Sequence, residues 1–113
     1  MTTISLRPYN GNLYLARSVA DYERSHQRLF KHPDVLQCNQ EGRFSGGCGK
    51  DGMWTYLVYG RNTHSLVHEL SHVVLHVFKR CGIDPRKAGG EPFCYMLSQL
   101  VLEALLVKPR RNK

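Results

Sequence analysis

The sequence predicts an α+β fold in which a short, mainly antiparallel sheet packs against helices. The order of local signals along the chain supports this prediction. Two strand-like segments and a helical segment come first, a segment rich in aromatic and β-branched residues lies in the middle, and two helical segments follow it. A chain of 113 residues most simply forms one domain. We therefore expect a single domain over residues 1–107, followed by a basic tail over residues 108–113.

The amino-terminal half alternates between strand and helix signals. Residues 2–8 and 12–16 have the composition of two short strands, separated by a turn that contains proline, asparagine and glycine. Apolar residues then recur at helical spacing from Ser18, and Pro33 ends that helix. Residues 34–52 contain five glycines and are expected to form a loop.

The carboxy-terminal half contains the stronger elements. Residues 53–59 are the best strand candidate because they are rich in aromatic and β-branched side chains. An amphipathic helix is expected to begin near Asn62 or Thr63, either of which can cap it, and to end at about Arg80, just before Gly82. A last helix is expected to begin at Glu91, because the proline that follows suits the first position of a helix.

Composition and charge narrow the function classes. With 42% hydrophobic and 22% charged residues, the chain can build a core and does not resemble a disordered segment. It has no apolar run long enough to span a membrane and no secretory signal, so we expect a cytoplasmic protein without a membrane partner. Four cysteines without a CxxC pair are expected to be reduced thiols. The net charge of +7 favours an acidic partner or nucleic acid, although a solvated basic tail is the alternative.

The clearest chemical signal is an HExxH motif formed by His68, Glu69 and His72 inside the predicted helix. Residues four apart lie one turn from each other on one helix face, so both imidazoles can reach one cation. The glutamate projects beside that cation, where it can accept a proton from a metal-bound water. The motif predicts one zinc ion per chain. The alternative is a helix whose histidines are ordinary surface residues.

Glu91 is the best candidate for a third zinc ligand, because catalytic zinc sites usually have three protein ligands and one open position. It follows His72 in an HExxH-x18-E arrangement, and glycines between the two helices permit the chain to reverse. Its alternative role is an acidic residue that stabilises a helix start. Tyr95 stands four residues later on the same helix face. Its phenol could stabilise the oxyanion of the reaction, or it could simply pack between helices.

Two more histidines extend the series at four-residue spacing, His64 before the motif and His76 after it. One helix cannot bring all four imidazoles to one ion, because each step of four residues rises about 6 Å and rotates about 40°. We expect His64 to line the cleft or bind substrate. We expect His76 either to support the metal ligands from behind or to be a packed structural histidine, and the second role is favoured.

From Trp54 to Leu100 the chain resembles the zincin metallopeptidases, in particular the gluzincins, whose third ligand is a glutamate. The resemblance lies in a strand, the HELSH helix and a second helix that bears Glu91. The segments LVHELSHVVLHVFKRCGI and GGEPFCYML are also similar to small metallopeptidase-like proteins encoded by bacteriophages. A phage origin would place the protein in the cytoplasm of the host cell.

The resemblance implies a small zincin-like domain with an active-site helix, and a carboxy-terminal helix that supplies the third ligand. It also implies that the strand at residues 53–59 is an edge strand that binds an extended substrate. The residues that it assigns are the zinc ligands His68, His72 and Glu91, the general base and acid Glu69, and Trp54 and Tyr56 on the substrate-binding strand.

We therefore expect a zinc-dependent metallopeptidase, in which a zinc-activated water attacks a peptide carbonyl and Glu69 is the general base. The substrate would be a peptide or protein. One alternative is a non-catalytic zinc-containing binding protein, such as a phage factor that engages a host protein. Another is a nucleic-acid-associated protein that binds through its basic surface.

Overall fold

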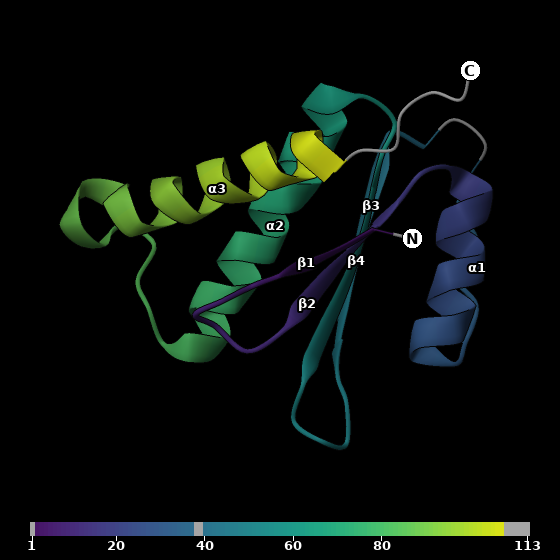
Figure 1. The fold of residues 1–113 in the computed structure, drawn as a ribbon, viewed down its shortest axis with the longest axis horizontal. Helices are drawn as coiled ribbons and strands as arrows, with labels where there is room; N and C mark the ends of the chain where they lie inside the picture. Colours follow the sequence, from purple (N-terminus) through teal and green to yellow (C-terminus); the bar gives the residue numbers. More distant parts are fainter. Residues whose placement is uncertain (1, 38–39, 108–113) are drawn as a thin grey trace.

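The structure, a computed structural model, describes residues 2–37 and 40–107. This part of the chain forms an α+β domain with four strands and three helices, as the sequence predicts (Figure 1). The basic tail expected over residues 108–113 lies outside the described residues. The strands are β1 (Thr2–Ser5), β2 (Asn12–Ala16), β3 (Gly42–Cys48) and β4 (Trp54–Gly60). The helices are α1 (Val19–Phe30), α2 (Thr63–Cys81) and α3 (Glu91–Val107), with a short 3₁₀ turn, η1 (Lys87–Gly90), before α3.

The described strands form one mixed sheet in the order β1-β2-β4-β3. The pairs β1–β2 and β3–β4 are antiparallel, and the central pair β2–β4 is parallel. The parallel pair arises because the chain leaves β2, crosses through α1 and β3, and returns beside β2 as β4. Within the described residues the sheet is therefore mainly antiparallel by pairing, with a parallel centre that the sequence did not indicate.

Strand β3 lies inside the segment expected to be a loop, so that expectation is wrong for residues 42–48. Glycine lowers strand propensity, and three of the seven residues of β3 are glycines. Pairing with the whole length of β4 compensates for this weak propensity. Consequently β4 is an interior strand, and the expectation that residues 53–59 form an edge strand is also wrong.

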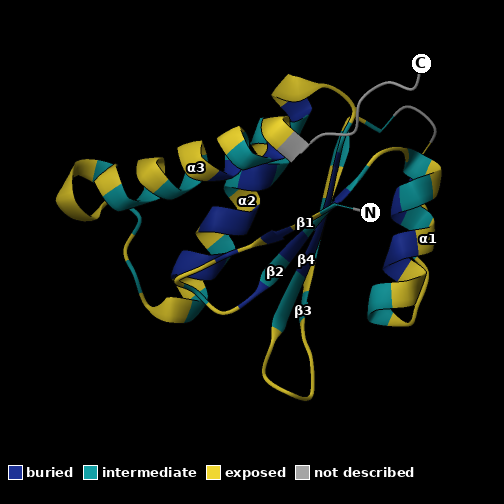
Figure 2. Ribbon diagram, viewed as in Figure 1, coloured by how far each residue is buried: buried dark blue, intermediate teal, exposed yellow. Residues whose placement is uncertain are grey.

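Helices cover both faces of the sheet, as Figures 1 and 2 show. On one face, Tyr22 of α1 packs with Leu36 and with Leu57 and Tyr59 of β4. On the other face, α2 and α3 cover a larger core. That core is apolar throughout, and its fully buried members include Leu13, Tyr56, Val58, Leu70, Val73, Val74, Val77 and Ala104.

Helix α2 has the ends that the sequence predicts. The side chain of Asn62 accepts a hydrogen bond from the backbone N–H of Ser65 at 2.8 Å, which caps the first turn. Gly82 ends the helix with φ 72°, a left-handed conformation that glycine adopts without strain. No helix in the described part of the chain is both long enough and apolar enough to cross a membrane.

The start of α2 lies very close to the end of β4 at Gly60. A Cβ atom there would lie 2.4 Å from the Cα of Leu66 and 2.5 Å from its backbone nitrogen. Because the obstructing atoms belong to the backbone of a helix, they cannot rotate away. The path from β4 into α2 therefore depends on the absence of a side chain at this position.

We expect Gly60→Ala to lower the free energy of unfolding by about 3 kcal/mol, because the new methyl group forces α2 away from β4. Gly52→Ala is the matched control. It lies in open space at φ 82°, so it should cost only about 1 kcal/mol from the left-handed backbone. Urea denaturation of both variants measures the difference. Equal losses would show that α2 tolerates a side chain at residue 60.

Candidate metal centre

The motif histidines lie on an exposed part of α2, beside the edge of the sheet that β3 forms. His68 and His72 are both exposed, whereas Leu70, Val73 and Val74 between and after them are buried in the core. The burial of the apolar residues fixes the rotation of the helix about its axis. As a consequence, the two imidazoles face solvent.

The two imidazoles converge on each other. The Nε2 atoms of His68 and His72 lie 3.3 Å apart, and the ring centroids lie 4.8 Å apart in an edge-on arrangement. Two nitrogen ligands of a tetrahedral zinc ion, each about 2.0–2.1 Å from the metal, are separated by about 3.3 Å. The pair therefore has the spacing of two ligands that share one zinc ion.

An aromatic contact with β3 supports this arrangement. The ring of Phe44 stacks on His72, with centroids 5.9 Å apart and an interplanar angle of 24°. Phe44 in turn stacks on Tyr56 at 6.0 Å. His72 is therefore held between His68 on its own helix and an aromatic ring on the neighbouring strand.

Glu69 lies on the sheet side of the histidine pair. A Cβ atom at Gly42 would come within 2.9 Å of both Cγ and Oε2 of Glu69, so the glutamate side chain fills the space that a side chain at residue 42 would need. Glu69 also lines a cavity of about 270 Å³ together with His64, Ser65, His68 and Glu41. The general base expected from the motif thus packs on the first residue of β3 and shares a cavity lining with His68.

Glu41 is a site residue that the sequence did not indicate, because it lies in the segment expected to be a loop. Its carboxylate accepts a hydrogen bond from the hydroxyl of Ser65 at 3.2 Å and pairs with Arg61 at 3.1 Å. These contacts fasten the start of β3 to the start of α2. The one sequence signal for a strand after Glu41 was that Gly42, Phe44 and Gly46 recur every second residue, which is the spacing of one strand face.

Within the described chain, β3 is an edge strand whose outer side has no strand partner. The N–H of Arg61 donates to the carbonyl of Glu41 at 2.7 Å, so in this antiparallel ladder odd-numbered residues turn their backbone groups toward β4. Even-numbered residues turn theirs outward, as the hydrogen bond from the Gln40 amide to the carbonyl of Gly42 at 3.1 Å shows. The next outward position, Phe44, lies beside His72.

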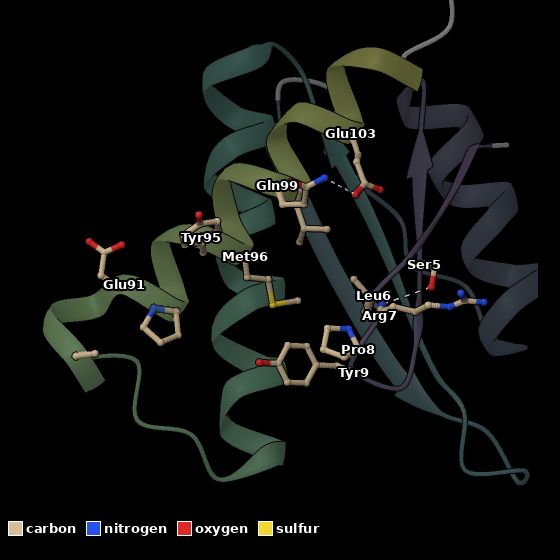
Figure 3. A pocket seen from close by; sticks show the side chains of 13 residues that line it. Ser5, Leu6, Arg7, Pro8, Tyr9, Glu91, Tyr95, Met96, Gln99 and Glu103 are labelled. Carbon is tan, nitrogen blue, oxygen red and sulfur yellow. Dashed lines mark hydrogen bonds between the residues drawn. The ribbon is translucent and has the colours of Figure 1, made fainter.

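Glu91 and Tyr95 lie elsewhere, at the start of α3. They line a separate cavity of about 510 Å³ with Arg7, Pro8 and Tyr9 of the β1–β2 connection (Figure 3). The described residues contain no group of three or more His, Cys, Asp or Glu side chains placed to hold a metal ion. The structure thus brings His68 and His72 together but does not bring Glu91 or Tyr95 to them.

The two aromatic residues expected to bind substrate are built into the fold instead. Tyr56 has no exposed surface, because β4 is an interior strand beneath α2. Its hydroxyl lies 2.8 Å from Nδ1 of His76 and accepts a hydrogen bond from Nε of Arg80 at 2.9 Å. Trp54 is half-buried, and the guanidinium of Arg80 lies over its ring at 5.1 Å. A substrate role for Tyr56 is inconsistent with this burial.

These contacts of Tyr56, Arg80 and His76 also explain the protonation state of His76. Burial, followed by the nearby charges of Arg80 and Lys79, lowers the pKa of the His76 imidazole below its ordinary value. Burial raises the pKa of the Tyr56 hydroxyl. Both groups are therefore neutral at pH 7, and His76 is a packed, hydrogen-bonded histidine, as expected from the sequence.

Comparisons with protein-family models, with curated protein sequences and with solved structures give no significant match for this chain.

The lowered pKa of His76 predicts a pH dependence of stability. Because the folded protein favours the neutral imidazole, the unfolded chain binds more protons as the pH falls below about 6.5, the ordinary histidine value. The contribution of His76 is thus present above that pH and is lost as the pH falls toward the lower folded pKa.

We expect His76→Asn to flatten the pH dependence of the unfolding free energy between pH 7 and pH 5, measured by urea denaturation. Exposed His64→Asn is the matched control for the loss of one imidazole from the same helix. The interpretation fails if the two variants behave alike.

Proposed function

We propose that this protein is a zinc-dependent hydrolase of peptide bonds, with His68 and His72 as zinc ligands and Glu69 as the general base. The observation that carries the proposal is the 3.3 Å separation of the two Nε2 atoms on an exposed helix face, beside the glutamate of the same motif. The same separation also suits a hydrogen bond between one protonated and one unprotonated Nε2. Measurement of the metal content, described below, distinguishes these two explanations.

The donor set fits zinc. Imidazole nitrogen is a common zinc ligand, and a catalytic site must leave at least one coordination position open to solvent. The exposure of His68 and His72 satisfies that requirement. When bound between them, zinc would polarise the substrate carbonyl and increase the acidity of a water molecule.

Glu69 is the residue that we propose transfers the protons of the reaction. Its carboxylate, partly buried over Gly42, would accept the proton of the attacking water and donate it to the departing amine nitrogen. An aspartate at this position would be one methylene shorter and would withdraw the carboxylate from the histidines. Gly42 is therefore part of the proposal, because a side chain there would displace the glutamate.

The substrate is proposed to bind along β3. An extended peptide added to an edge strand gains hydrogen bonds from the backbone groups that point outward. The ring of Phe44 stacks on His72, so we propose that a peptide bonded to the outward backbone groups of Phe44 passes near the histidine pair. This assignment replaces β4, the strand that the zincin resemblance suggested, with its neighbour.

Glu91 is proposed as a third ligand only in a rearranged form of the protein. For its carboxylate to reach the histidine pair, the first turn of α3 would have to leave the cavity that it shares with Tyr9 and Pro8. Ala88, Gly89 and Gly90, which precede that turn, all have positive φ. Metal content of a Glu91 variant separates the two-histidine site from the three-ligand site.

Metal analysis tests the ligand assignment. We expect the purified protein, dialysed against one equivalent of zinc at pH 7.5, to retain one zinc ion per chain. His68→Ala and His72→Ala should each lose it, because neither remaining imidazole holds zinc alone. His64→Ala, an exposed histidine one turn earlier on the same helix, is the matched control and should retain zinc. Glu91→Ala retains zinc if two histidines suffice and binds it more weakly if α3 rearranges. Full zinc content in His68→Ala would rule out the site.

Hydrolysis tests the role of Glu69. We expect Glu69→Gln to retain zinc and to cleave a mixed fluorogenic peptide library about 10²- to 10⁴-fold more slowly, because the amide cannot accept the proton. Glu103→Gln, which makes the same change on α3, should cleave at the parental rate. If Glu69→Gln is as active as the parent, the mechanism is wrong. If no variant, nor the parent, cleaves any peptide but all bind zinc, the protein is a non-catalytic zinc protein.

A further inference from the structure

A second surface, on α1, is distinguished by its charge. Arg24, Arg28 and Lys31 recur at spacings of four and three residues, so they follow one face of the helix. All three are exposed, and Arg17, also exposed, stands just before the helix. We call these four residues the α1 basic face. The opposite side of α1, with Tyr22 and His26, is buried against the sheet.

The two acidic residues of α1, Asp21 and Glu23, form hydrogen bonds within the fold. Glu23 accepts a hydrogen bond from the backbone N–H of Leu36 at 2.9 Å. Asp21 accepts one from the backbone N–H of Arg17 at 2.8 Å and one from Ser25 at 3.3 Å. Asp21 also forms a long, exposed ion pair with Arg24 at 3.7 Å, which is a weak interaction.

The α1 basic face is separate from the candidate metal centre. Helix α1 lies on one face of the sheet, whereas α2 and α3 lie on the other (Figure 1). Figure 2 shows the outer side of α1 exposed along its length. A large ligand could therefore occupy the α1 basic face without covering the histidine pair.

We propose that the α1 basic face binds the phosphate backbone of nucleic acid. Three of its four cations are arginines, whose planar guanidinium groups match phosphate oxygens in pairs. Backbone contacts of this kind require no apolar anchor. Protein partners and membrane surfaces usually require one, and no large exposed hydrophobic residue of the described chain lies on α1. The binding is independent of base sequence.

Charge neutralisation at matched positions tests this proposal. The first variant, Arg24→Gln with Lys31→Asn, removes two cations of the α1 basic face. Asparagine suits residue 31, whose φ is 67°. The control, Arg86→Gln with Lys87→Gln, removes two exposed cations from the connection before α3. Each double variant lowers the formal net charge of +7 by two, and all proteins keep residues 108–113.

The measurement is fluorescence anisotropy of a labelled 20-base-pair duplex, titrated with each protein at several salt concentrations from 25 to 200 mM. For a protein that contacts phosphates through these four cations, log Kobs should fall with log salt with a slope of about −3 to −4. The α1 variant should bind about tenfold more weakly than the parent at the upper salt concentrations, with a slope smaller in magnitude by about 2. The control should retain the parental slope.

Three results would overturn the proposal. The first is an equal loss of duplex affinity in the two double variants, and the second is no binding of the duplex by the parent at 25 mM salt. The last is tighter binding of polyglutamate or of anionic phospholipid vesicles than of the duplex. The first would mean that net charge alone drives association. The last would assign the face to an acidic protein or to a membrane surface. Circular dichroism verifies that both double variants keep the parental fold.

Discussion

The close packing of α2 against the sheet is the constraint on which the rest of the structure depends. Glycines stand at two positions where α2 contacts the strands and a side chain would not fit. At Gly60 the backbone of α2 leaves no room for a Cβ atom, and at Gly42 the side chain of Glu69 occupies that room. Van der Waals repulsion at these distances is steep, so the two glycines fix both the path into α2 and the position of the glutamate.

This packing also determines which chemistry α2 can support. Burial of Leu70, Val73 and Val74 uses one side of the helix for the core, and the neighbouring side is left beside the free edge of β3. Two imidazoles and a carboxylate therefore project next to the edge strand of the described sheet, the strand that we propose binds the substrate. Phe44 connects β3 with the histidine pair, since it belongs to β3 and its ring stacks on His72.

Local signals predicted the elements well, and non-local pairing explains most of the differences. The caps of α2 at Asn62 and Gly82 follow from residue type alone, and so does the convergence of histidines four apart. Strand β3 could not be predicted from composition, because its glycines are favoured by the atoms packed over them rather than by strand propensity. Once β3 is present, β4 becomes interior and Tyr56 becomes buried. These two changes are the reason that residues 53–59, expected to form an edge strand, form an interior strand instead.

The position of Glu91 was also beyond local reasoning. The chain between His72 and Glu91 is long enough to reach back, and its glycines allow a reversal, but length and flexibility do not fix a direction. In the structure, α3 is placed by its apolar side, through Leu100 and Ala104 in the core and Phe93 against Phe78. That packing puts Glu91 beside the β1–β2 connection, so only the two histidines of the expected ligand set lie together.

The central claim is that His68 and His72 bind one zinc ion. The most direct measurement is X-ray absorption spectroscopy at the zinc edge, on protein loaded with one equivalent of zinc. The account predicts imidazole nitrogen neighbours at about 2.0–2.1 Å, with the multiple-scattering pattern of two histidine rings, and loss of that pattern in His72→Ala. Sulfur neighbours at about 2.3 Å, or a spectrum unchanged in His72→Ala, would contradict it and would place the metal elsewhere on the chain.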